Sequence, residues 1–441
     1  MQQQLAEIQS IVEDVLKLAK DKGATQAEAS MSKIEGIAVS SRLKEVETVE
    51  FTNDGGLGIT VYKGNKKGSA STADLSPQAL TLTVEKAIEI AKHTSDDDCS
   101  GLAEKELMAF EYPDLDLFHP IELDTEQAIQ QVIAAEASAL DVDSRITNSD
   151  GASYNANLGA KVYGNSHGML AGYNSSRYNM SCVVIGEQDG DMQRDYSYSV
   201  SRQANLLTSP EQLGQEAAQF TLDRLGARKV KTCKVPVLFD REIAAGLFGH
   251  FISAISGGSL YRKSSFLLDK LEQQVLPSWF NISERPHILK GLASSPFDHE
   301  GVRTQDLKVV SQGILNSYLL TSYSARKLKM NTTGHAGGIH NWFIQHTGET
   351  DKEMLAKLGT GLLVTELMGQ GVNIVTGDYS RGAAGFWVEN GVIQYPVHEI
   401  TIAGNLADML MNIVAIGAEQ ETRGSIQTGS VLIENMQVAG E

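Results

Sequence analysis

VETVEFTNDGGLGITVY, residues 46–62, is the stretch that decides the fold class of this chain. Its two β-rich runs, VETVEFT and LGITVY, flank Asn53-Asp54-Gly55-Gly56, and these residue types tolerate the positive φ of a tight turn. We therefore predict a hairpin at this point. It belongs to an antiparallel meander that extends from Ala27 to Ser71.

Helical patterns lie on both sides of this meander. Apolar residues at helical spacing predict an N-terminal amphipathic helix that ends at Lys22-Gly23. Ser76-Pro77 begins a second helix, because serine can cap a helix and proline suits its first turn. Further along we predict helices over 125–140 and 209–226, a second meander between 144 and 204, and a surface-wrapping segment over 95–123.

The second half begins with VPVLFD, residues 235–240, a short apolar run that predicts a buried strand. A helix over 241–255 follows, and the rest is mostly β in character. Hairpin turns are predicted at Gln312-Gly313 and Asn390-Gly391, and a late helix over 405–413. Clusters of strands alternating with helices favour an α+β fold with packed helices in an N-terminal domain, 1–230, and a β-rich C-terminal domain, 231–441.

Composition excludes several classes of protein. The 441 residues carry 37 Lys+Arg against 55 Asp+Glu, a formal net charge of -18 that disfavours direct nucleic-acid binding. The three cysteines are widely spaced and predict no disulfide framework. No apolar run approaches the length of a membrane span and the N-terminus lacks signal-peptide features, so we expect a soluble cytoplasmic protein.

Motifs of common hydrolases are missing from the sequence. It contains no phosphate-binding GxxxxGK, no G-x-S-x-G elbow, and neither HExxH nor HExxxH, the zinc-binding patterns that place a base beside a metal-bound water. Two groups of residues remain as alternatives. Ser166 and Ser380 lie in Gly-rich loops, and a dispersed metal site could use Asp298, His299, His335 and His340.

The helix REIAAGLFGHFISAIS, residues 241–256, leads to a family resemblance that covers essentially the whole chain. The sequence resembles the TldD/PmbA family, and specifically its PmbA branch, also called TldE. The most specific stretches are VETVEFTNDGGLGITVY, KGSASTADLSP (67–77), KVYGNSHG (161–168), VLFDREIAAGLFGHFISAISGGSLYRKSSFL (237–267), TTGHAGGIHN (332–341), GDYSRGAAGFWVENGVIQYPVHEITIAGNL (377–406) and SIQTGSVLIENMQVAG (425–440).

The resemblance implies a cytoplasmic peptidase assembled from two homologous subunits. TldD-type chains carry HExxxH on the helix after the buried strand, and a C-terminal cysteine completes their metal site. Here Ala245 stands at the first histidine position, Gly246 at the glutamate position and His250 at the second histidine position, while ETRGSIQTG (421–429) contains no cysteine. Alanine and glycine cannot bind zinc, and without the glutamate no neighbouring base takes a proton from metal-bound water.

These implications predict a PmbA/TldE-type subunit that is not catalytic alone. It would bind no cofactor itself, and zinc would be on a TldD-type partner in a complex that processes unfolded peptides, held in extended form at a sheet edge. The isolated chain could form a homodimer. The alternatives are an autonomous hydrolase that uses the dispersed metal or loop-serine residues, and a binding protein that modulates DNA gyrase, an activity also ascribed to the family.

Overall fold

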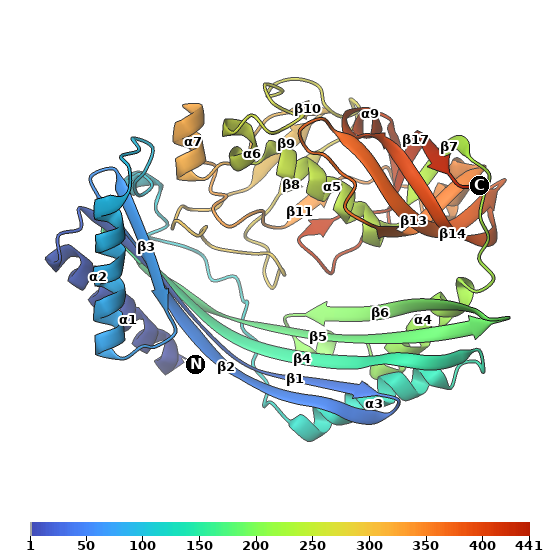
Figure 1. Ribbon diagram of the computed structural model, residues 1–441, viewed down its shortest axis with the longest axis horizontal. Coiled ribbons are helices and arrows are strands. Elements are labelled where there is room, and N and C mark those ends of the chain that lie inside the picture. The colour runs from blue at the N-terminus through green and yellow to red at the C-terminus, as the bar shows by residue number, and fades with distance from the viewer. Residues whose placement is uncertain (1) are drawn as a thin grey trace.

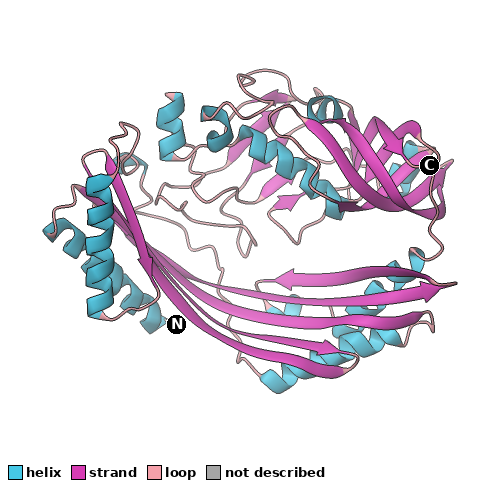
Figure 2. Ribbon diagram, in the orientation of Figure 1, coloured by secondary structure: helices cyan, strands magenta, loops and turns pink. Residues whose placement is uncertain are grey.

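The computed structural model describes residues 2–441, and Figure 1 shows that they form two layers. One long, curved six-stranded sheet occupies the N-terminal half. Helices cover its outer face, and the C-terminal half lies across the other face. The mixture of helices and antiparallel strands in both halves, coloured in Figure 2, confirms the predicted α+β class.

The large sheet is antiparallel throughout and runs in the order β3-β2-β1-β4-β5-β6. Its strands are β1 Gln26–Arg42, β2 Glu45–Lys63, β3 Lys66–Thr72, β4 Ile146–Asn165, β5 Leu170–Gln188 and β6 Asp191–Ser201. Its helices are α1 Gln2–Asp21, α2 Pro77–His93, α3 Thr125–Leu140 and α4 Pro210–Asp223. Ser76 caps α2 as predicted, and Ser209 caps α4.

The hairpin predicted at Asn53–Gly56 is wrong, because β2 continues through these residues as one strand. Gly55 pairs with Lys33, and Gly56 pairs with Ser32. A side chain at Gly55 would approach the Ser32 carbonyl oxygen to 3.2 Å, so the glycine permits close approach of two strands. The local turn propensity of residues 53–56 is overridden because β2 pairs with β1 both before and after these residues.

The chain turns instead between β1 and β2, at Leu43 and Lys44, whose φ angles are 52° and 67°. Glu136 of α3 stabilises this turn from a fully buried position. Its carboxylate accepts hydrogen bonds from the backbone N–H groups of Leu43 (2.7 Å) and Lys44 (2.9 Å) and from Ser41 Oγ (2.9 Å). A side chain of the helix thereby accepts the backbone N–H groups of a turn whose residues have positive φ.

Two apolar cores lie between the large sheet and its helices. The core under α1 and α2 includes Val12, Val15, Ile59, Val84 and Val162. The core under α3 and α4 includes Val132, Tyr154, Tyr178, Val184 and Leu213. Because side chains alternate along a strand, the residues between these core positions face the C-terminal half.

The C-terminal half contains two sheets. The first runs β14-β13-β12-β7-β17-β15, and β14 also pairs with β17, so five of its strands close into a ring. The second runs β10-β9-β8-β11-β16. The strands are β7 Cys233–Phe239, β8 Ile282–Glu284, β9 Leu307–Ser311, β10 Ile314–Leu315, β11 Trp342–Ile344, β12 Gly361–Met368, β13 Asp378–Glu389, β14 Val392–Asn405, β15 Ile413–Ile416, β16 Ile426–Gln427 and β17 Val431–Ala439.

The helices of this half are α5 Arg241–Ile255, α6 Gly257–Tyr261, α7 Ser322–Leu328, α8 Asp351–Leu358 and α9 Leu406–Met411. The predicted turns at Gln312-Gly313 and Asn390-Gly391 are present, with positive φ at all four residues. No helix within residues 2–441 is both long and apolar enough to cross a bilayer.

The segment over 95–123 does not simply wrap the surface, as its lack of periodicity had suggested. Ala103, Met108 and Ala109 are buried against Phe297 and Val302 of the C-terminal half. Met108 also forms an isolated β-bridge with Val302. The segment therefore joins the two halves of the molecule, and its contacts are too far apart in sequence to leave a periodic signal.

Candidate functional site

Helix α5 is the first candidate, because it follows the buried strand β7 in the position that the family resemblance singles out. Asp240 caps it by accepting a hydrogen bond from the Glu242 N–H group, 3.0 Å long. Leu247, Phe248 and Phe251 pack into the C-terminal core, which fixes the helix and leaves its other face outside that core.

That other face offers a cation only one nitrogen ligand. Ala245 is half-buried, and Gly246 is exposed with no atom within 4 Å of where a side chain would begin. The His250 ring lies edge-on to Tyr379, with 6.1 Å between ring centroids. Burial and the nearby charge of Arg381 lower the pKa of His250. A metal ion does not fit here, because one imidazole remains and the positive charge of Arg381 acts on it.

The C-terminal stretch 421–429 contacts the first turn of α5. Arg423 pairs with Glu421 and, at 3.1 Å, with Glu242 of α5. Its guanidinium lies over the Tyr198 ring of β6, 4.0 Å from the centroid, and donates a 2.8 Å hydrogen bond to the Tyr198 carbonyl. Arg423 therefore ties the large sheet to α5 and places a second fixed positive charge near it.

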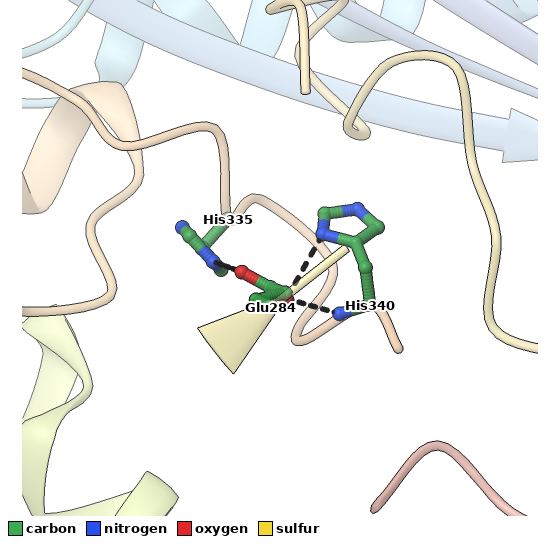
Figure 3. Close-up of side chains that lie close together, drawn as sticks. All are labelled: Glu284, His335 and His340. Atoms are coloured by element: carbon green, nitrogen blue, oxygen red, sulfur yellow. Dashed lines mark hydrogen bonds and ion pairs between the residues drawn. The ribbon is translucent and has the colours of Figure 1, made fainter. Parts of the chain in front are cut away.

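A second candidate is the buried cluster of Glu284, His335 and His340 (Figure 3). Glu284 ends β8, and the two histidines lie in the loop before β11. The Glu284 carboxylate is 2.6 Å from His335 Nε2 and 3.1 Å from His340 Nδ1, and it also accepts the His340 backbone N–H. Burial raises the pKa of Glu284, but hydrogen bonds from both histidines outweigh burial and lower the pKa to about 2.

The loop that carries the two histidines owes its shape to Gly337 and Gly338, whose φ angles are 101° and 113°. Asp298 stabilises this loop through hydrogen bonds to the backbone. Its carboxylate accepts backbone hydrogen bonds from Ala336 (3.0 Å), Glu300 (2.8 Å) and Val302 (2.9 Å). Burial, together with the charge of Glu300, raises the pKa of Asp298 to about 7.

The structure therefore brings together His335 and His340 of the dispersed site but gives Asp298 and His299 other positions. Asp298 supports the loop, and the exposed His299 packs against Gly337. Sequence reasoning missed Glu284. The signal was the ISE run at 282–284, where strand alternation puts Glu284 on the same buried face as Ile282.

The loop serines lack a hydrogen-bonded histidine in the described chain. Ser166 Oγ accepts the Ala27 N–H at 3.1 Å, while the neighbouring His167 ring is bonded to the Ala103 carbonyl. Ser380 lies exposed on strand β13, so its predicted position in a loop is wrong. Neither serine has a base placed to take its proton in this arrangement.

A hollow of about 590 Å³ lies on the face of the large sheet that is turned away from its helices. It adjoins a second hollow of about 390 Å³, and the two share Ser30, Gly58, Ser71, Tyr163 and His299 in their linings. We call this pair of hollows the trough. Its floor carries mostly small residues of β1, β2 and β3, and β3 is an edge strand of the sheet.

Titratable side chains also line the trough. Burial raises the pKa of Glu28, whose carboxylate accepts a 2.9 Å hydrogen bond from the Tyr163 hydroxyl. Burial lowers the pKa of Lys161. The trough thus combines small residues, hydroxyls and partly desolvated charges. Such a lining suits the polar backbone of a bound chain better than it suits large apolar side chains.

Models of a metallopeptidase family match this chain in both of its halves. Family models of the PmbA/TldA metallopeptidase match as domain 1 over residues 27–91, as central domain over 118–225 and as C-terminal domain over 232–440. The chain belongs to the PmbA/TldE branch of the PmbA/TldD family.

Curated relatives cover nearly the full chain. Metalloprotease PmbA of Escherichia coli O157:H7 is 58% identical over 98% of this chain and 96% of its own. The Metalloprotease PmbA homolog of Haemophilus influenzae is 56% identical over the same shares.

Solved structures share the fold over the same length. A Bacteroides thetaiotaomicron protein solved as a candidate modulator of DNA gyrase is 26% identical, covers 98% of both chains and superposes with a TM-score of 0.93. TldE of Thermococcus kodakarensis is 19% identical, covers 98% of this chain and 100% of its own with a TM-score of 0.82, and shows the fold alone.

Proposed function

We propose that this chain is the non-catalytic subunit of a two-chain metallopeptidase of the cytoplasm, whose catalytic zinc is held by a TldD-type partner. The face of α5 carries the proposal. Peptide hydrolysis by a zinc peptidase needs metal ligands and a base beside the metal-bound water. Ala245 and Gly246 supply neither, and the His250 ring lies edge-on to Tyr379 and experiences the positive charge of Arg381.

The proposed substrate is an unfolded peptide in extended form. Support comes from the trough, whose floor lies beside the edge strand β3 and whose small side chains, such as Ser30 and Ser71, leave room for a peptide backbone. An edge strand can pair with a further strand through backbone hydrogen bonds, which depend little on sequence. The chain would then present the bound peptide to the partner's zinc. We place its two domains at residues 1–230 and 231–441.

Two other functions receive less support. An autonomous metallohydrolase built on the dispersed residues would need Asp298, but this carboxylate already accepts three backbone hydrogen bonds. A gyrase-modulating binding protein would match the descriptions of two structural neighbours, from Bacteroides thetaiotaomicron and Thermotoga maritima. The net charge of -18 disfavours direct binding of this chain to DNA.

Co-elution and peptide turnover with a TldD-type chain test the proposal. We expect the two chains to elute together, whereas this chain alone gives a monomer or homodimer without turnover. In the mixture, changing the glutamate of the partner's HExxxH to glutamine abolishes turnover, while His250→Ala in this chain leaves it unchanged. Turnover by this chain alone, or its loss with His250→Ala, would refute the non-catalytic role.

A further inference from the structure

We propose that Glu284, His335 and His340 bind one divalent transition metal ion, with zinc the best match, in a buried structural site. This site is separate from α5 and from the proposed catalytic zinc of the partner. It goes beyond the proposed function, because the ion would hold this chain's own loop in place and take no part in peptide hydrolysis.

The geometry of the cluster suits a metal ion. Within residues 2–441 it is the one group of at least three His, Cys, Asp or Glu side chains whose ligand atoms all lie within 4.8 Å of one another. Zinc takes nitrogen and oxygen ligands at about 2.0–2.1 Å, so neighbouring ligands of a tetrahedral ion lie about 3.4 Å apart. Glu284 Oε2 lies 2.6 Å from His335 Nε2 and Oε1 lies 3.1 Å from His340 Nδ1, so these two pairs need to open by less than about 1 Å. The two ring nitrogens lie within 4.8 Å of each other.

The hydrogen bonds around His335 already orient it as a ligand. Its Nδ1 lies 2.8 Å from Thr333 Oγ1, and this oxygen accepts the Leu320 N–H at 2.7 Å. The Thr333 hydroxyl proton has the Tyr318 carbonyl as an acceptor at 3.2 Å. With the His335 proton on Nδ1 and donated to Thr333, Nε2 would be free to bind a metal ion, whereas without a metal the ring donates from Nε2 to Glu284. The bond to Thr333 is the outer hydrogen bond that metal-bound histidines commonly make.

Each ring nitrogen is paired with a different oxygen of the Glu284 carboxylate, His335 Nε2 with Oε2 and His340 Nδ1 with Oε1. Without a metal ion, each of these two contacts needs its own ring N–H as the donor. A divalent ion satisfies both ring nitrogens and the carboxylate at once. Among the described residues, the ion pairs of Glu284 are with these two histidines and include no lysine or arginine.

The burial of the three residues indicates a structural role. Glu284 is 1% exposed, and His335 and His340 are each 7% exposed. The ion would connect the centre of a sheet, at Glu284 of β8, to the loop that carries both histidines. Three protein ligands leave room for one water, but no second carboxylate of the cluster is placed to act as its base.

Metal uptake by the full, untagged chain tests this proposal. The protein is stripped with a chelator, incubated with zinc, dialysed and analysed for metal per chain. We expect about one zinc per chain, and a thermal midpoint that rises with zinc. Glu284→Gln and His340→Gln should each weaken binding at least tenfold, while the control His250→Gln binds like the wild type. Circular dichroism verifies that each variant is folded.

Cobalt substitution of the wild-type chain gives a readout that needs no variant. A four-coordinate site with nitrogen and oxygen ligands predicts the intense visible absorption of tetrahedral Co²⁺, displaced by one equivalent of zinc. Uptake below a tenth of an equivalent, or equal uptake by all variants, would overturn the proposal. Peptide turnover with a TldD-type partner is measured separately, so a failure of the metal site is distinguishable from a failure of the subunit role.

Discussion

Replacing Gly337 with alanine perturbs the loop that carries His335 and His340 through two separable effects. The φ angle of 101° disfavours any residue with a Cβ, at about 1–2 kcal/mol. The new Cβ would also lie 2.5 Å from His299 Nδ1 and 2.6 Å from His299 Cγ, a contact that forces the ring or the backbone to move. Overpacking of this kind costs about 1–3 kcal/mol, and the low end applies because the His299 ring is exposed.

Gly338 is the matched control. Its φ angle of 113° carries the same backbone penalty, but a Cβ there would meet no atom within 4 Å. We therefore expect Gly337→Ala to reduce the free energy of unfolding by about 1 kcal/mol more than Gly338→Ala does. Adding His299→Ala to the Gly337→Ala variant should recover this difference, since it removes the clashing ring.

Urea unfolding followed by tryptophan fluorescence measures these differences. Trp342 is fully buried two residues after His340, so it reports on this part of the fold. Equal destabilisation by the two alanine variants, within about 0.5 kcal/mol, would refute the packing of His299 on the loop. So would a His299→Ala change that leaves the Gly337→Ala variant as unstable as before.

Three further predictions concern buried polar groups. Because the pKa of Asp298 is raised to about 7 in the folded chain and lies near 3.8 unfolded, its carboxyl stabilises most at acid pH. The stability advantage of wild type over Asp298→Asn should fall by about 1 kcal/mol per pH unit from pH 4 to 7 and then level off; a constant difference would contradict this. Arg423→Ala removes the guanidinium from Glu242 and Tyr198 and should lower stability by about 1–3 kcal/mol in thermal unfolding, whereas an unchanged midpoint would show that Arg423 does not join the halves. Glu136→Gln leaves one turn N–H unpaired, so amide exchange at residues 43–44 should accelerate by tenfold or more, and unaltered exchange would speak against the buried cap.

The sequence predicted elements whose signals are local. Helix 241–255 has a capping aspartate and an apolar face, and it lies where the pattern put it. Asn390-Gly391 forms a turn because both residues adopt positive φ between two strands that pair directly. Such features depend on a few neighbouring residues, so one sequence is enough to find them.

Features that depend on distant contacts could not be predicted in this way. Asn53–Gly56 has the composition of a turn, yet pairing with β1 keeps it extended. Glu284 lies about fifty residues before its histidine partners, and only the sheet brings β8 beside the loop before β11. The buried residues of segment 95–123 likewise find their partners in the C-terminal half.

Turnover of an unfolded peptide at a fixed concentration of a TldD-type chain, as this chain is added, tests the central claim most directly. The account predicts no turnover from this chain alone and a rate that rises with each addition until the two chains are equimolar, then stays constant. His250→Ala should give the same curve. Turnover by this chain without the partner, or a rate indifferent to its addition, would contradict the account.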